Sequence, residues 1–506
     1  MELPISLIDK VDGIHAVNTA HPNTNKPYIA TSLAWDSREV KDGSLFIGIK
    51  GEHVDGNDFI EQAIKSGAAA VIAGRGTTAQ ERENANENHV ALFEASYPNA
   101  SRKRGANDED NANACSSANA SSDNGILALQ NIASAYRTYV LNDTEVIGVT
   151  GSSGKTTTKD MTAAVLGSKL SVMATSGNYN NHIGAPATVL SADKATRALV
   201  VEMGMSSRGE IATLAHIARP RIGVITNIGT AHMQQLGSRE NIALAKAELL
   251  EALPNGTGIA VLNGDDPYSH FMRKAARLDE RDIKLVYYGL NERNDVHAAD
   301  IEYDDNGRAS FNMWLKGDEA PTRVKLALSG KHNISNALAA AAVGQLMGVA
   351  AYDIANALAN VNAGKMRQHV FDTQEGVTII DDTYNANPDS MRAALDVLAH
   401  FPAGRQHIAV LGDMLELGES SRKLHKGIGL HAADTNVDAL ITIGEQARMI
   451  ANGAREGGMR DEHIYEAQDV AGALDVLRPF LSADKPVILV KASRGMHLED
   501  VVGQVA

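Results

Sequence analysis

Short apolar runs alternate with helix-compatible stretches along most of this chain, and turn residues separate them. In the first part, residues 44–49 and 68–73 are apolar runs of the length expected of buried strands. Residues 126–140 have the apolar spacing of a helix. The first part of the chain is therefore predicted to form a small α/β unit.

The same rhythm of strands and helices continues to the C-terminal end. Further strands are predicted at residues 198–203, 221–228, 258–262, 377–380, 407–411, 439–443 and 487–490. Helical patterns flank these runs, which favours mostly parallel sheets covered on both faces by helices. Ligands of such sheets gather at the carboxyl ends of the strands, so polar residues just after each run are candidates for function.

One tract interrupts this pattern. Residues 98–125 are rich in Asn, Ala, Ser and Asp and contain almost no large apolar side chain. Such a composition cannot bury enough apolar surface to order itself. We therefore predict a disordered surface insertion, which contains the single cysteine, Cys115.

The apolar run at residues 145–149 leads into a glycine loop. The loop consists of Gly151, Ser152, Ser153, Gly154, Lys155, Thr156 and Thr157. A strand, a glycine loop and a helix are the layout of a phosphate-binding loop, in which backbone N–H groups point at phosphate oxygens. Lys155 can reach the β- and γ-phosphates, and the Thr156 hydroxyl can ligate Mg²⁺. A plain Gly/Ser turn with a solvated lysine is the simpler alternative, but the motif favours use of a nucleoside triphosphate.

The phosphate loop and the strand pattern together predict three α/β domains. A small N-terminal domain covers residues 1–140, and a central phosphate-loop domain with a parallel sheet covers residues 141–327. A Rossmann-like domain covers residues 328–506. A length of 506 residues agrees with about three domains.

Composition narrows the classes of function. The formal net charge of −15 argues against broad binding of nucleic acid or of anionic membranes. The N-terminal residues lack a signal-peptide pattern, and the small-apolar stretch at residues 337–352 is too short to span a bilayer. One cysteine excludes an internal disulfide framework. These features predict a cytoplasmic protein.

Several polar residues follow the predicted strands of the central domain. Glu202 and His232 each come after an apolar run and, with Thr156, could hold Mg²⁺ beside a triphosphate. Such residues are more often structural hydrogen-bonding groups. Asn178, Asn180 and Asn181 could bind an oxygen-rich substrate or simply form turns.

Lys246 lies in an evident helix with Glu240 and Glu248 nearby. From these residues alone, a solvent-facing lysine with helical ion pairs is the favoured interpretation.

The last third of the chain adds a second group of candidates. Asn333 and Asn336 lie three residues apart at a predicted helix start and so share a face. Arg367 could neutralise developing phosphoryl charge. Asp382 follows a predicted strand, where a carboxylate can bind ribose hydroxyls or form a turn.

Taken in order, these motifs resemble the Mur ligases, ATP-dependent amide-forming enzymes of peptidoglycan precursor synthesis. The resemblance covers nearly the whole chain except the insertion. The segments that carry it further are residues 36–38, 51, 55–56, 175–186, 381–390 and 411–419. They are similar to those of the family member that joins D-Ala-D-Ala to UDP-MurNAc-tripeptide. Two positions differ from the family pattern: Ala492 follows Lys491 where Gly is usual, and Met366 precedes Arg367 where Gly is commoner.

The resemblance implies an acyl-phosphate mechanism, with ATP and Mg²⁺ as cofactors and a monomeric protein. It implies catalytic roles for Lys155, His232, Lys246 and Arg367, and ATP contacts from residues 151–157, Asn333, Asn336, Arg367 and Asp382. It implies metal ligation by Thr156, Glu202, His232 and Lys246, the last as a carbamate. It implies substrate contacts from Ser37, Arg38, Asn178, Asn180, Asn181, Tyr384, Asn385 and Asn387.

Other classes of protein fit the sequence less well. Folylpolyglutamate synthase, a ligase of the same superfamily, should lack the uridine-nucleotide first domain. A GTPase switch would require an NKxD motif, which the chain does not contain. A motor or transport ATPase would require a standard Walker A loop, but the residue five before Gly154 is Val149 rather than Gly.

Overall fold

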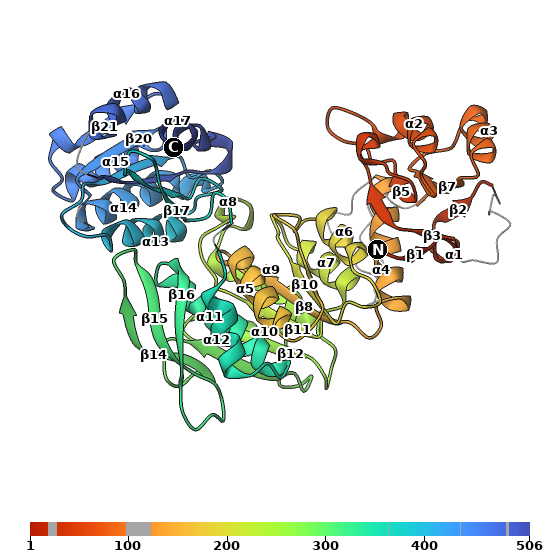
Figure 1. The fold of residues 1–506 in the computed structure, drawn as a ribbon, viewed down its shortest axis with the longest axis horizontal. Coiled ribbons are helices and arrows are strands. Elements are labelled where there is room, and N and C mark those ends of the chain that lie inside the picture. The colour runs from red at the N-terminus through yellow and green to blue at the C-terminus, as the bar shows by residue number, and fades with distance from the viewer. Residues whose placement is uncertain (19–27, 98–122, 363, 436, 482–484) are drawn as a thin grey trace.

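The computed structural model describes residues 1–18, 28–97, 123–362, 364–435, 437–481 and 485–506. Three α/β parts follow one another along the chain, with the N-terminal part (red) and the C-terminal part (blue) on either side of the central one (Figure 1). The predicted three-domain α/β fold is thereby confirmed. Most of the predicted insertion lies outside the described residues. Its last two residues, Asn124 and Gly125, are not part of an insertion, because they form the start of a helix.

The N-terminal part is built on a small sheet with strand order β2-β7-β6-β5-β4. Strands β4 to β7 are parallel, and β2 joins the edge antiparallel to β7. The predicted strands at 44–49 and 68–73 are β5 and β6. The elements are β1 (Leu3–Pro4), α1 (Ile5–Ile8), β2 (Ile14–Ala16), β3 (Ile29–Ala30), β4 (Ser32–Ala34), β5 (Ser44–Ile47), α2 (Ile60–Lys65), β6 (Ala70–Ala73), α3 (Ala79–Glu87), β7 (Ala91–Ala95) and α4 (Asn124–Tyr139).

The central part is a sheet with the order β16-β15-β14-β13-β12-β11-β8-β10-β9. From β9 to β14 neighbouring strands are parallel, as predicted. The strands are β8 (Glu145–Thr150), β9 (Val172–Ala174), β10 (Ala198–Glu202), β11 (Ile222–Ile225), β12 (Ile259–Asn263), β13 (Lys284–Gly289), β14 (Val296–Tyr303), β15 (Arg308–Trp314) and β16 (Thr322–Ser329). The helices are α5 (Lys155–Gly167), α6 (Gly184–Ser191), α7 (Glu210–Ala218), α8 (Met233–Leu236), α9 (Arg239–Glu251), α10 (Ser269–Ala275), α11 (His332–Leu346) and α12 (Ala351–Ala359).

An antiparallel extension formed by β14, β15 and β16 was not predicted. Along β15, buried and partly exposed side chains alternate, which is the pattern of a strand with one solvated face. The strands predicted from the sequence are continuous apolar runs, which are typical of parallel strands buried on both faces. The alternating strands of the extension contain no such continuous run, which is why the apolar pattern does not predict them.

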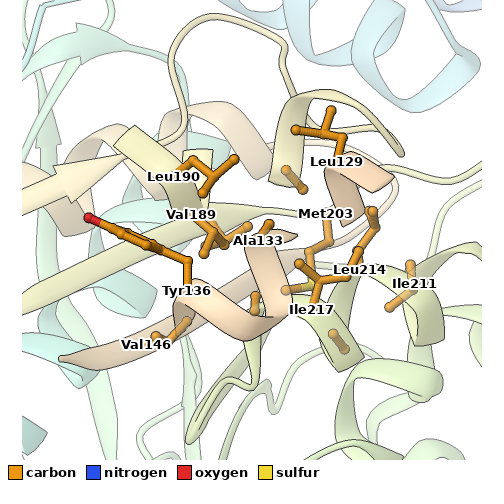
Figure 2. Packing of buried hydrophobic residues seen from close by; sticks show 14 of the residues in the cluster. Leu129, Ala133, Tyr136, Val146, Val189, Leu190, Met203, Ile211, Leu214 and Ile217 are labelled. Carbon is orange, nitrogen blue, oxygen red and sulfur yellow. The ribbon is translucent and has the colours of Figure 1, made fainter. Parts of the chain in front are cut away.

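Both faces of the parallel sheet are covered. On one face α5 and α11 pack together over β8, and their side chains share a core with Ile147 and Val149. The opposite face carries α4, α6, α7 and α9, whose side chains share a core with Val146 (Figure 2). In this second core Leu129, Ala133 and Tyr136 of α4 meet residues of α6 and α7 (Figure 2). Helix α4 therefore ties the N-terminal part to the central sheet.

The C-terminal part is a sheet with the order β17-β18-β22-β19-β20-β21. Its strands are parallel except for β17, which pairs antiparallel with β18. The elements are β17 (His369–Asp372), β18 (Thr378–Asp381), α13 (Pro388–Ala399), β19 (His407–Gly412), α14 (Ser421–Asp434), β20 (Ala439–Ile443), α15 (Arg448–Glu456), β21 (Ile464–Ala467), α16 (Val470–Leu481), β22 (Val487–Lys491) and α17 (Glu499–Val505). No helix in the described parts of the chain is long and apolar enough to cross a membrane.

The division predicted at residue 328 falls inside β16. Beyond this strand, α11 packs against α5, and α12 packs against β16 and α5. The core that these helices share with the central sheet extends to Val361. We therefore propose that the central domain ends near residue 362.

Candidate active site

A cavity of about 700 Å³ lies between the central and C-terminal parts. The central part contributes residues 152–157 of the glycine loop, together with Glu202 and His232. Asn333, Asn336, Arg367, Asp382, Tyr384, Asn385 and Asn387 also line it. The structure thus brings most of the predicted nucleotide and metal residues around one space.

The glycine loop takes the shape predicted for a phosphate loop. Gly151 follows β8 with φ of 154°, and a Cβ atom there would lie 1.7 Å from Oγ1 of Thr226. That hydroxyl donates to the carbonyl oxygen of Ser153 over 2.6 Å, which holds the loop against β11. Gly154, with φ of 75°, begins α5, so the amino end of this helix faces the cavity.

Two lysines converge on one carbonyl oxygen of this loop. Nζ of Lys155 and Nζ of Lys246 each donate to the carbonyl oxygen of Gly151 over 2.9 Å. Lys246 is only 1% exposed. Burial lowers the pKa of both amines, and the positive charge of Lys155 lowers the pKa of Lys246 further.

The interpretation of Lys246 as a solvent-facing lysine, which the helix pattern favoured, is therefore wrong. Lys246 lies on the sheet side of α9, where its long stem reaches the loop across the end of β8. Glu248 does not pair with it, because its carboxylate accepts from the N–H groups of Gly209 and Ala212. Glu240 instead accepts from the hydroxyl of Tyr268.

Glu202 ends β10 beside the loop, because its register partner on β8 is Val149. The side chain is 1% exposed, and its Oε1 accepts from Nδ2 of Asn180 over 2.7 Å. Oε2 is buried and has no hydrogen-bond partner among the residues that the structure describes. A buried carboxylate oxygen without a partner is costly, and a cation can satisfy it.

His232 precedes α8 with φ of 62° and lines the same cavity. Its Nδ1 lies 3.2 Å from Oε2 of Glu416, which comes from the C-terminal part. Burial and the neighbouring lysines lower its pKa. Within the described parts of the chain, no group of three or more His, Cys, Asp and Glu side chains converges as a metal site.

The two asparagines at the start of α11 are buried and bonded to one another. Nδ2 of Asn336 donates to Oδ1 of Asn333 over 2.9 Å, and Asn333 donates to the carbonyl oxygen of Ser329. Oδ1 of Asn336 also accepts from Thr158 of α5. The pair is fixed at the cavity wall, directly behind Gly154.

The C-terminal part presents a second cluster. The guanidinium of Arg367 lies 3.7 Å from the centre of the Tyr384 ring, a cation–π contact. Asp382 is paired with Lys491 over 2.7 Å, and burial raises the pKa of the Asp382 carboxyl. Asn387 caps α13 through Oδ1, which accepts from the N–H of Ser390 over 2.9 Å.

Some of the predicted substrate residues do not line this cavity. The guanidinium of Arg38 donates to both carboxylate oxygens of Asp36, and the Ser37 hydroxyl donates to Oε1 of Gln62. All of these residues belong to the N-terminal part. Asn178 is also absent from the cavity wall among the described residues, whereas Asn181 lines it and accepts from two N–H groups that begin α6. An edge-on contact of Trp35 with Tyr179 brings the N-terminal part beside the 178–181 loop.

Two residues that hold the central and C-terminal parts together were not predicted. Oδ2 of Asp389 accepts from the N–H of Thr230 over 3.1 Å. Glu416 contacts His232, and its carbonyl oxygen accepts from the N–H of Gln234. Both acidic residues lie in segments that carried the resemblance, but nothing in their spacing indicates a partner in another domain.

Three family models match the chain in order. They are described as the catalytic domain of the Mur ligase family (residues 30–136), the Mur ligase middle domain (149–344) and the Mur ligase glutamate ligase domain (366–494). The UDP-N-acetylmuramoyl-tripeptide–D-alanyl-D-alanine ligase of Bacillus subtilis is 38% identical, over 93% of this chain and 92% of that protein.

Solved structures agree with these matches. MurF from Acinetobacter baumannii is 28% identical with a TM-score of 0.82, covering 100% of this chain and 99% of that one. The MurF ligase of Thermotoga maritima, solved in complex with ADP, is 29% identical with a TM-score of 0.74 and covers 94% and 97%.

Substitution of Gly151 tests the phosphate loop. Gly151→Ala would place a Cβ atom against Thr226, so the loop must move and its N–H groups must turn away from the phosphates. We expect ATP affinity to fall by at least about tenfold, measured by isothermal titration calorimetry. Gly167→Ala is the matched control, because a Cβ atom at this helical glycine meets nothing within 4 Å. Equal affinity of both variants would contradict the loop assignment.

Proposed function

This chain belongs to the Mur ligase family, and from that premise we propose that it joins D-alanyl-D-alanine to UDP-N-acetylmuramoyl-tripeptide in an ATP-dependent reaction. The product is the UDP-linked pentapeptide used in peptidoglycan synthesis. One observation carries the proposal: similarity to ligases of this name extends over 93% of the chain, including the first domain. A folylpolyglutamate synthase is the weaker alternative, since an enzyme of that kind should lack a uridine-binding first domain.

The reaction proceeds in two steps. A carboxylate oxygen of the tripeptide attacks the γ-phosphorus of ATP, and ADP leaves with the electrons of the broken P–O bond. The amine of D-Ala-D-Ala then attacks the acyl carbon, loses a proton, and the tetrahedral intermediate expels inorganic phosphate. Phosphorylation is needed because a carboxylate oxygen is a poor leaving group and phosphate is a good one.

The cavity supplies groups for the first step. Lys155 and Arg367 distribute the charge of the transferred phosphoryl group. Asn333 and Asn336 contact the adenine, and Asp382 contacts the ribose. On the substrate side, Ser37 and Arg38 hold the uridine nucleotide. The muramoyl-peptide lies against the 178–181 loop, and the C-terminal substrate contacts are Tyr384, Asn385 and Asn387.

Mg²⁺ fits the residues present. The unpartnered Oε2 of Glu202 and the Thr156 hydroxyl are oxygen ligands of the kind that Mg²⁺ prefers, completed by phosphate oxygens and water. His232 would serve a second ion. A bound Mg²⁺ would neutralise charge on the β- and γ-phosphates.

Lys246 has the environment required for a carbamate. Its amine is buried beside another cation, so the neutral form that reacts with CO₂ is favoured. Addition of CO₂ to the neutral amine would release a proton and leave a negatively charged carbamate, which Lys155 and a metal ion can both stabilise.

We also propose a monomer that acts in the cytoplasm. All residues assigned to the nucleotide come from one chain, so no second copy is needed to complete the site. The cytoplasmic assignment follows from the use of ATP as phosphoryl donor.

Phosphate release with each substrate omitted in turn tests the reaction. We expect turnover only when ATP, UDP-MurNAc-tripeptide and D-Ala-D-Ala are all present, because neither step can complete without its acceptor. The measurement is a coupled assay for inorganic phosphate. Turnover with a folate and glutamate in place of the two peptide substrates would contradict the proposal.

Removal of the Lys246 amine tests the carbamate. Lys246→Ala should lower kcat by about 10²–10³-fold, since it removes a charged group next to the transferred phosphoryl group. Small carboxylic acids such as acetate should restore part of the rate by taking the place of the carbamate. Lys155→Ala is the matched comparison: it should be inactive and should not respond to the acids. Wild-type rates for Lys246→Ala would rule out the carbamate.

A further inference from the structure

Lys491 is the last residue of β22 and is 1% exposed. Its Nζ lies 2.7 Å from Oδ2 of Asp382, 2.8 Å from the carbonyl oxygen of Asn385 and 3.4 Å from the carbonyl oxygen of Asp382. An ammonium group has three hydrogens, so these three acceptors occupy all of them. In this arrangement Lys491 has no hydrogen left to donate to a ligand, although it lines the cavity.

The register of the sheet explains why these residues meet. Strands β18 and β22 are parallel neighbours in which Asp381 pairs with Val490, so the next residues, Asp382 and Lys491, lie side by side at the carboxyl ends of the two strands. The N–H of Asp382 also donates to the carbonyl oxygen of Val490. The pair is therefore set by backbone geometry as well as by charge.

The second oxygen of Asp382 connects the pair to the segment that enters the C-terminal domain. Oδ1 accepts from the N–H of Gln368 over 3.2 Å. Two residues later in the loop, the N–H of Tyr384 donates to the carbonyl oxygen of Met366. Met366 and Gln368 have φ of 64° and 50°, which side chains rarely adopt without support. The loop after β18 thus braces the turn that carries Arg367.

Burial alone would favour the protonated form of Asp382, and a protonated carboxyl is a weaker acceptor. Lys491 opposes this effect of burial on the pKa of Asp382 more strongly than Arg367 does, because its ammonium is in direct contact with the carboxylate. Without Lys491, the buried carboxyl would lose its ion-pair partner and one of its fixed contacts.

We propose that Lys491 is a positioning residue: its contacts with the Asp382 carboxylate and with the loop after β18 fix Asp382 in place to accept hydrogen bonds from the ribose hydroxyls of the bound nucleotide, without touching the nucleotide. This inference rests on the ribose contact assigned to Asp382 under the proposed function. It assigns to Lys491, whose neighbour Ala492 departs from the family pattern, a role in nucleotide binding.

The test compares the dissociation constants of the full-length protein for ATP and for 2′,3′-dideoxy-ATP, measured by calorimetry in the presence of MgCl₂. The wild-type protein should bind ATP at least about tenfold more tightly, because hydrogen bonds to a charged acceptor are among the strong ones. Lys491→Met should reduce the ratio of the two dissociation constants to about one, because it should weaken the binding of ATP and leave the binding of the dideoxy analogue unchanged. Asp382→Asn should do the same, and the double variant should be no worse than either single variant.

Lys159→Met is the matched control. Lys159 is also buried, and its Nζ donates to the carbonyl oxygen of Thr175 over 2.6 Å, but it does not line the cavity. It should keep the wild-type ratio. If Lys491→Met fails to fold, as judged by circular dichroism, Lys491→Arg takes its place. A guanidinium keeps the charge but not the three-acceptor geometry, so its ratio should fall below the wild-type value.

Three results would overturn the inference. The first is equal weakening of ATP and the dideoxy analogue by Lys491→Met, which would indicate a structural role only. The second is a wild-type ratio of the two dissociation constants in the Lys491 variants, together with a lost preference for ATP in Asp382→Asn. The third is a wild-type protein without ribose discrimination, which would also remove the role of Asp382. The proposed ligase reaction would survive all three, because it is judged by phosphate release.

Discussion

Two buried amines share one backbone oxygen, and the rest of the site is arranged around this pair. Lys155 and Lys246 both donate to the carbonyl oxygen of Gly151, where burial opposes the protonation of both amines and the charge of Lys155 further opposes that of Lys246. A triphosphate relieves this cost by supplying negative charge. The site is therefore ready for an anionic ligand, and its unpartnered carboxylate oxygen on Glu202 is ready for a cation.

The sheet determines where these groups meet. Strand β8 lies between β10 and β11, and these parallel neighbours deliver Glu202 and Thr226 to the same end of the sheet as the glycine loop. Thr226 can hold the loop only because Gly151 has no side chain. The C-terminal sheet repeats the principle with Asp382 and Lys491 at the ends of adjacent parallel strands. Each half of the site is thus produced by strand register, and contacts such as Asp389 with Thr230 bring the halves together.

The parts of this site that could be predicted are those whose role depends on residues adjacent in the sequence. The glycine loop and the carboxylates after apolar runs are visible in sequence because their function depends on adjacent residues. Lys246 could not be placed from its helix alone, since the spacing in α9 does not reveal which face meets β8. The pairing of Lys491 with Asp382 depends on the order of β18 and β22, and 109 residues separate the two partners. The edge formed by β14 to β16 was missed because its strands alternate instead of forming apolar runs.

We propose that the loop delivers the γ-phosphoryl group to a carboxylate and not to water. Tripeptide substrate labelled with ¹⁸O in its terminal carboxylate tests this most directly, with mass spectrometry of the phosphate released during ligation. The account predicts one ¹⁸O atom in each phosphate, because the carboxylate oxygen that attacks phosphorus leaves with it. Unlabelled phosphate from that substrate, or phosphate that takes its new oxygen from ¹⁸O-labelled water, would contradict it.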